Sequence, residues 1–280
     1  MSRRKRTSTG QPVNGQAKAA AEGSTRGPTK GPTKGGQRPS AREQARDKIA
    51  RENKRRREQR IIFVVAAAVV LALIGGGIGI QLWRSRKAPD TPNQSAASAV
   101  AQLNAVVPPV TGKPLVLGQA DAPVTVTLYE DFHCPHCAEF EERYGSILTD
   151  AQIAGRIKIE LYPMAFIDAG SARASNAMAC AAEAGFPQTY YLGLFANPSL
   201  DWNASQLISL ATTVGGAATP EFTRCVDDGK HDAWVTSINA AANANGVSST
   251  PTMFIDAQPV DITTLTTDSL RNQLDEAARS

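Results

Sequence analysis

The hydrophobic pattern has one dominant feature, a run of twenty residues from Ile61 to Ile80 without a charge or a proline. At about 1.5 Å per residue, a helix over this run would be about 30 Å long, the thickness of the hydrocarbon layer of a bilayer. Trp83 follows it, and tryptophan is typical of the membrane interface. A buried core helix of this length would normally carry a polar stripe. A cleaved signal peptide would have a shorter leader and a small-x-small cleavage site. We therefore predict one uncleaved signal anchor.

Beyond the apolar run, the pattern alternates between strand and helix signals. The expected strands are 115–117, 124–130, 157–162 and 252–256, and the expected helices are 135–148 and 264–278. Between them, about 170–246 is an Ala-rich helical stretch punctuated by Gly and Pro. Periodicity alone predicts a mixed α/β domain.

The charges are divided as sharply as the hydrophobicity. Residues 1–60 hold 18 Lys and Arg against 5 Asp and Glu, whereas residues 88–280 hold 9 against 21. Residues 1–38, rich in Gly, Pro, Ser, Thr and Lys, are expected to be disordered, and 40–60 to form a polar helix that runs into the span. A basic tail next to a membrane anchor is better explained by topology and anionic headgroups than by nucleic acid, so no nucleic-acid partner is expected.

The same charges predict the topology. Four arginines (Arg55, Arg56, Arg57 and Arg60) precede the span and three cations follow it, so the N-terminus is expected in the cytoplasm of a single-pass cell-membrane protein. The expected organisation is a cytoplasmic tail (1–60), the anchor (61–80), a linker rich in Ala, Ser and Pro (81–110) and an extracytoplasmic domain (111–280). All four cysteines then lie in an oxidising compartment.

The chemistry is indicated by Cys134-Pro135-His136-Cys137, which directly follows an expected strand and opens an expected helix. Helix N–H groups and the helix dipole stabilise a thiolate there, so Cys134 is expected as an exposed nucleophile and Cys137 as a more buried partner. Pro135 suits the first helical turn. His136 is expected to donate to the thiolate or place a positive charge beside it. Both effects favour the reduced form and make the disulfide a stronger oxidant.

Three segments together resemble the DsbA-type branch of the thioredoxin superfamily: the motif after Tyr129-Glu130-Asp131-Phe132, the block from Ser249 to Asp256, and more weakly the lead-in from Gly118 to Val124. The likeness covers about residues 113–279. It implies a thioredoxin-like core with an inserted helical subdomain. It also implies that Thr250 and Pro251 form a cis-proline loop facing the active-site disulfide.

The resemblance implies an enzyme that introduces disulfides into reduced secreted proteins. It would be re-oxidised by a quinone-linked membrane partner of the DsbB or VKOR type, without a small-molecule cofactor. A reductase or isomerase on the same fold is an alternative. A non-catalytic anchored binding module is another, against which the intact Cys134, Cys137 and Pro251 argue.

Neighbouring residues leave other interpretations open. His133, Cys134, His136 and Cys137 are all possible zinc ligands, but four ligands within five residues cannot easily surround one tetrahedral ion, so no metal is expected. We expect His133 to be a surface histidine. Glu130 could lie under the site and relay a proton to Cys137, although the best-known family member has its buried acid two positions earlier. Glu130 or Asp131 as a plain strand-end carboxylate is an equal alternative.

The two remaining cysteines, Cys180 and Cys225, lie in the helical stretch. Their even number and their compartment predict a structural disulfide. Independent buried thiols and a second, strained redox pair are the alternatives.

Overall fold

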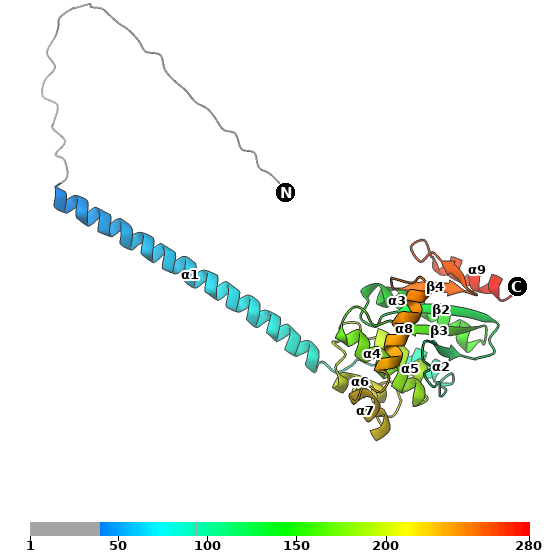
Figure 1. The fold of residues 1–280 in the computed structure, drawn as a ribbon. Coiled ribbons are helices and arrows are strands. Elements are labelled where there is room, and N and C mark those ends of the chain that lie inside the picture. Colours follow the sequence, from blue (N-terminus) through cyan, green and yellow to red (C-terminus); the bar gives the residue numbers. More distant parts are fainter. Residues whose placement is uncertain (1–39, 93) are drawn as a thin grey trace, which may run out of the picture. The chain divides into compact units, whose positions relative to one another are not determined.

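The computed structural model describes residues 40–92 and 94–280, and the predicted disordered tail (1–38) lies outside the described residues. The described residues fall into two units, 40–66 and 67–280, whose boundary lies within helix α1 (Ala41–Arg86). Figure 1 shows the elements along the chain.

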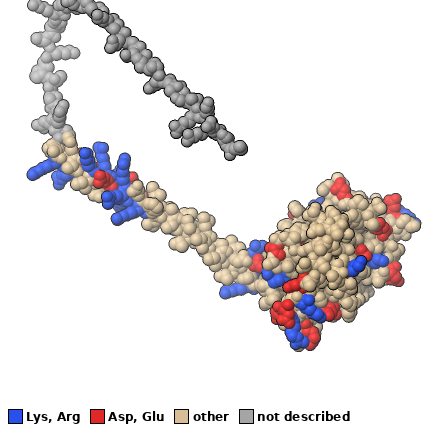
Figure 2. Space-filling model, in the orientation of Figure 1, with Lys and Arg blue, Asp and Glu red and all other residues tan. Residues whose placement is uncertain are grey.

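Helix α1 is continuous over 46 residues, so the expected polar helix and the expected apolar span form one element. Ser40 and Glu43 begin it with reciprocal hydrogen bonds of a capping box. Basic side chains gather on its first half, and an uncharged stretch follows (Figure 2). Within the described part of the chain, α1 is the one helix long and apolar enough to cross a membrane. These properties support a single-pass anchor near the N-terminus.

The folded domain is built on a five-stranded mixed sheet in the order β1-β3-β2-β4-β5. The strands are β1 (Leu115–Gly118), β2 (Val124–Glu130), β3 (Ile157–Pro163), β4 (Thr252–Ile255) and β5 (Gln258–Val260). β2 and β3 are parallel, and the other neighbours are antiparallel. The first four residues of β2 and of β3 alternate between buried and half-buried, and the last three of each strand are all buried.

Strand β5 was not predicted. It forms a hairpin with β4 through Asp256 and Ala257, which have positive φ angles of 46° and 65°. Asn or Gly usually occupies such positions, so Ala257 gave no hairpin signal.

Helix α3 (Pro135–Ile153) follows β2 and extends five residues beyond its predicted end. Its buried face includes Phe140 and Tyr144, which contact each other as their spacing of four predicts. Helix α9 (Thr267–Ala277) packs against α3 and β4.

Five helices form the predicted insertion between β3 and β4. They are α4 (Ala169–Glu183), α5 (Pro187–Phe195), α6 (Ala204–Thr213), α7 (Pro220–Asp227) and α8 (Asp232–Ala244). α4 is the hub, since it contacts each of the other four. Its small, buried Ala side chains allow this close approach.

The predicted linker (81–110) is only partly an extended tether. Its first residues continue α1, and it contains helix α2 (Gln94–Ala101), which packs against α3 and α5. Val100 is buried, and the Val107 N–H donates to the carbonyl oxygen of Ala182 at 2.8 Å. The composition signalled a loop, but these two apolar residues attach the segment to the domain.

Candidate active site

The two cysteines of the motif lie where β2 turns into α3. Cys134 is the N-cap residue of α3, in an extended conformation, and Pro135 takes the first helical position. The Cys134 N–H donates to the Asp131 carbonyl oxygen at 2.9 Å, which closes the turn. Cys134 is 7% exposed and Cys137 fully buried, and both are free thiols. The expectation that Cys134 is exposed is thus wrong for the side chain as a whole, because the facing loop covers it.

The surroundings lower the pKa of Cys134 from 9.0 to about 5. The largest cause is the hydrogen bond with the Cys137 thiol. The Thr250 side chain and the backbone N–H groups of Cys137 and His136 also favour the thiolate, while burial opposes ionisation. The pKa of Cys137 is raised beyond its usual range by burial, by its hydrogen bond with Cys134 and by the charge of Glu130. One sulfur is therefore an anion at neutral pH, and the other remains a thiol.

The loop before β4 faces Cys134. The Thr250-Pro251 peptide bond is cis, as predicted, and the Cys134 thiol lies 3.6 Å from the Thr250 carbonyl oxygen, to which it donates when protonated. A groove of about 320 Å³ adjoins this contact and is lined by His136, Arg143 and Pro251, among others. An extended peptide would meet main-chain groups and the reactive sulfur together there.

The imidazole of His136 does not reach the thiolate. Its side chain is 77% exposed, and its Nδ1 lies 3.4 Å from Glu139 Oε2. His136 contributes to stabilising the Cys134 anion through its backbone N–H. The predicted role of the His136 side chain is therefore not seen. Its position on the first turn of α3 directs the ring to solvent.

Glu130 lies fully buried beneath the cysteines. The Tyr191 hydroxyl donates to its Oε2, whereas Oε1 has no hydrogen-bond partner. Burial and the charge of Glu141 raise the pKa of Glu130 well above its usual value. Burial also raises the pKa of Glu141, to about 7. Because burial shifts its pKa upward, Glu130 is suited to exchange a proton with a neighbouring group rather than only to end a strand.

Sequence reasoning missed two residues of the group around Glu130. Tyr191 was expected in the core of the helical stretch, and it does lie there, but its hydroxyl reaches the carboxyl group of Glu130. Glu141 lies four residues after Cys137 on α3, and this spacing places both on one helix face, a signal that could have found it.

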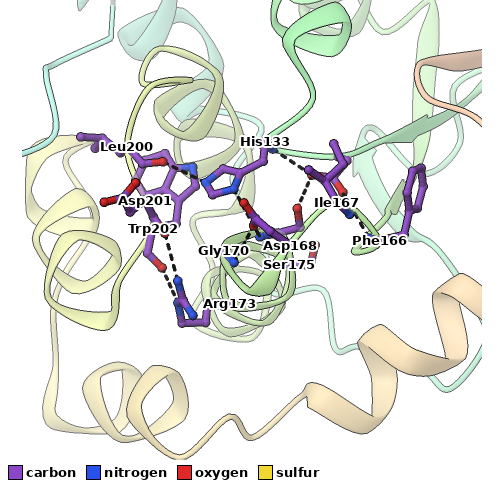
Figure 3. A network of polar contacts seen from close by, with 12 residues as sticks. His133, Phe166, Ile167, Asp168, Gly170, Arg173, Ser175, Leu200, Asp201 and Trp202 are labelled. Carbon is purple, nitrogen blue, oxygen red and sulfur yellow. Dashed lines mark hydrogen bonds and ion pairs between the residues drawn. The ribbon is translucent and has the colours of Figure 1, made fainter. Parts of the chain in front are cut away.

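His133 is also placed differently from its prediction. Its side chain is only 10% exposed, so it is not a surface histidine. Nδ1 lies 2.7 Å from Asp168 Oδ1, and Nε2 lies 2.8 Å from the Leu200 carbonyl oxygen (Figure 3). Because the rings of His133 and His136 contact different partners, these two possible zinc ligands are held apart.

Cys180 and Cys225 form a disulfide that links α4 to α7, with their sulfurs 2.04 Å apart. His231 lies close to both sulfurs. Its Nε2 lies 3.1 Å from Glu183 Oε2. The bond thus fastens two helices of the insertion within the core of the domain.

A family model described as thioredoxin matches residues 110–276. The chain belongs to the thioredoxin family. The match covers the five-stranded sheet, the Cys134-to-Cys137 motif and the insertion, and it leaves out α1.

Solved structures share this fold. DsbA from Mycobacterium tuberculosis, in its oxidised form, is 22% identical with a TM-score of 0.50, over 63% of this chain and 94% of that one. BdbD from Bacillus subtilis, also oxidised, is 22% identical with a TM-score of 0.53, over 64% and 99%. MdbA from Corynebacterium matruchotii, described as a thiol-disulfide oxidoreductase, is 22% identical with a TM-score of 0.51, over 63% and 99%. The expected thioredoxin-like core with a helical insertion is confirmed, and DsbA is among the structures that share this fold.

Among curated proteins, the serine/threonine-protein kinase PknE of Mycobacterium tuberculosis is 28% identical over 201 residues. The match covers 64% of this chain but only 34% of the kinase, so the chain spans about a third of that relative's length.

Proposed function

We propose that this protein is a membrane-anchored thiol–disulfide oxidoreductase that introduces disulfides into secreted proteins through Cys134 and Cys137. The observation that carries the proposal is the unequal pair of thiols. One sulfur ionises at the N-terminus of α3 with a pKa of about 5, and a buried thiol lies beside it. The loop at Thr250 and Pro251 offers main-chain groups next to the ionised sulfur.

The proposed reaction begins from the oxidised site. A substrate thiolate attacks Cys134 Sγ, the Cys134–Cys137 bond breaks, and Cys137 leaves as a thiolate that takes up a proton. A second substrate thiolate then attacks the substrate sulfur of the mixed disulfide and releases Cys134 as a thiolate. The substrate dithiol has lost two electrons and two protons; the enzyme has gained the two electrons, one proton is on Cys137, and the other has gone to solvent because Cys134 remains a thiolate.

Glu130 is the proposed proton donor to the departing Cys137. Burial raises the pKa of Glu130, and an ionised Glu130 raises the pKa of Cys137, so a single proton shared between these two groups is favoured over two adjacent anions. Transfer of a proton from Glu130 would neutralise the departing Cys137 thiolate, and the resulting carboxylate would regain a proton by way of solvent.

The direction of the reaction follows from the thiolate. A stabilised Cys134 anion lowers the free energy of the reduced site, whereas the disulfide has no anion to stabilise, so the site tends to accept electrons. The enzyme would need a membrane oxidase to restore its disulfide. The quinone-linked DsbB or VKOR type is the class implied by the resemblance, and no small-molecule cofactor is required.

The proposed location is the outer face of the cell membrane. Arginines concentrated before the apolar span support a cytoplasmic N-terminus, and the Cys180–Cys225 disulfide suits an oxidising compartment. A membrane-impermeant maleimide applied to intact cells held under mild reductant should label Cys134 of the full chain. The Cys134→Ala protein is the control. Labelling that requires lysis would contradict this topology.

The catalytic test uses the full chain in detergent with a reduced, unfolded protein as substrate. We expect Cys134→Ala to abolish oxidation and Cys137→Ala to accumulate a mixed disulfide at Cys134, visible by non-reducing electrophoresis and mass spectrometry. Oxidation by the Cys134→Ala variant would refute the mechanism.

The reduction potential separates oxidase from reductase or isomerase. A value near ~−120 mV is that of a strong oxidant, and one near ~−270 mV is that of a reductase. A potential near ~−270 mV would contradict the proposed oxidase direction and indicate a reductase.

A further inference from the structure

The reaction proposed above does not use His133, although this residue directly precedes Cys134. Its ring lies between the start of α4 and the loop at 200–202, and Figure 3 shows it pointing between Asp168 and Leu200. The fit is close, since a Cβ added to Gly170 would lie 2.1 Å from the His133 Cε1 atom. Glycine at position 170 thus makes room for this ring.

Both hydrogen-bond partners of the ring are acceptors. The Leu200 carbonyl can only accept, and the Asp168 carboxylate already accepts from the N–H groups of Gly170 and Ser171 at 2.7 and 3.0 Å. Each ring nitrogen of His133 must therefore carry a hydrogen to satisfy its contact, which makes the side chain an imidazolium cation. The imidazolium contacts an anion on one side and a carbonyl dipole on the other, so these hydrogen bonds fix the orientation of the ring. We call this set of contacts, from His133 to Asp168 and Leu200, the brace.

The loop that receives this brace is fixed independently of it. Arg173 donates to the carbonyl oxygens of Trp202 and Asp201 at 2.7 and 3.0 Å, as Figure 3 shows. Trp202 is fully buried and has a positive φ of 48°, which a bulky residue adopts only where its surroundings enforce it. The brace thus attaches the cysteine turn to a rigid part of the insertion.

His133 is also connected to Cys134, the residue with the reactive sulfur, through hydrogen bonds of the main chain. The His133 N–H donates to Asp131 Oδ1 at 2.8 Å, and that oxygen also accepts from the Ser171 hydroxyl at 2.7 Å. The Asp131 carbonyl accepts from the Cys134 N–H. His133 is therefore linked to α4 directly, and Cys134 is linked to α4 through Asp131.

The two redox states depend on this attachment to different extents. In the oxidised site, the covalent Sγ–Sγ bond itself holds Cys134 against Cys137. In the reduced site, only non-covalent contacts keep Cys134 facing the N–H groups of His136 and Cys137. Loosening the turn should therefore raise the free energy of the reduced site more than that of the oxidised site.

We infer that His133 is a doubly protonated positioning residue whose bonds to Asp168 and Leu200 hold the reduced site in its thiolate-stabilising geometry, and so help make the enzyme an oxidant. The inference rests on the proposed function and deepens it. It assigns His133 no contact with substrate and no part in the proton transfers.

The redox test compares His133→Phe with His231→Phe in the full chain. His231 is a suitable control because its side chain is 12% exposed and also pairs with a carboxylate, that of Glu183, in the insertion. We expect His133→Phe to shift the equilibrium with glutathione about tenfold toward the oxidised enzyme, which corresponds to ~30 mV. His231→Phe should leave the equilibrium within about twofold of wild type, even if both variants lose similar stability.

Asp168→Asn supplies a second variant that keeps the size of the partner. It should shift the equilibrium in the same direction as His133→Phe, and the double variant should show no further shift, because the two residues act as one unit. If His133→Phe does not fold, Asp168→Asn carries the test alone. An unchanged equilibrium in Asp168→Asn would then overturn the inference.

The protonation state can be measured directly, because the chain contains only three histidines. Nitrogen-15 NMR of selectively labelled, reduced full-length protein at pH 7 should show both His133 ring nitrogens protonated. A neutral, single-tautomer ring would overturn the inference whatever the redox result.

The two proposals fail in different ways. A wild-type protein that does not exchange with glutathione would refute the proposed function and, with it, the redox role of His133. Normal exchange in wild type with an unchanged potential in the folded His133→Phe variant would overturn the role of His133 alone.

Discussion

Ionisation of Cys134 should make the stability of the reduced protein depend strongly on pH. The pKa of this thiol falls from 9.0 to about 5 in the folded state. A depressed folded pKa adds stability that is complete above the unfolded pKa and is lost as the pH falls through the folded pKa. The window for the reduced protein therefore runs from about pH 9 down to about pH 5.

The size of the effect at neutral pH follows from the same two values. Between pH 7 and pH 4 the folded thiolate passes through its pKa, which lies about two units below neutrality, while the unfolded thiol stays protonated throughout. At 1.36 kcal/mol per unit, the reduced domain should lose ~3 kcal/mol of unfolding free energy over this interval. The side chain is only 7% exposed, so solvent screening removes little of this.

Urea unfolding of the reduced full chain in detergent, followed by the fluorescence of the buried Trp202 and Trp234, measures this loss. The Cys134→Ala variant supplies the pH dependence of all other groups, and the difference between the two proteins isolates the thiol. Titration of thiolate absorbance should place its midpoint near 5. A difference below ~1 kcal/mol, or a midpoint near 9, would refute the electrostatic reasoning.

Three further predictions concern groups around the thiols. Replacing Cys180 and Cys225 together by Ser should cost ~4 kcal/mol of unfolding free energy, the value that the chain-entropy model gives for a loop of 45 residues. The equilibrium of the active-site pair with glutathione should not change. A shifted equilibrium would mean that the Cys180–Cys225 bond takes part in the redox chemistry. The wild-type protein should lose at most ~3 kcal/mol of unfolding free energy as the pH rises from 4.5 to about 7, because its folded state holds a proton on Glu141 that the unfolded chain has released. Glu141→Gln should not show this loss. Urea unfolding at pH 4.5 and 8 tests this, and a variant with the pH dependence of wild type would contradict it. His136→Ala should change the pKa of Cys134 by less than ~0.5, because the contributing donor is a backbone N–H, and a larger change in thiolate absorbance titration would show that the exposed ring acts at a distance.

The local pattern of the chain determined its elements. Alternation along β2 and β3, Pro135 at the start of α3 and twenty uncharged residues in α1 each act through interactions within a few residues, so they could be interpreted without the fold. The position of the cysteine pair at a strand-to-helix turn followed from the same local signals, and that position predicted thiol–disulfide chemistry. Strand β5 was missed because Ala257 adopts a positive φ that only its tertiary surroundings stabilise.

Only the tertiary structure decided which groups surround the sulfurs. Cys134 faces a loop 116 residues downstream, and Tyr191 reaches Glu130 because the insertion packs against the sheet. His133, just before the motif, and His136, within it, are three residues apart in sequence, yet His136 points to solvent and His133 is enclosed by α4 and the 200–202 loop. A side chain's partners depend on which distant elements exclude water around it, and local periodicity carries no information about that.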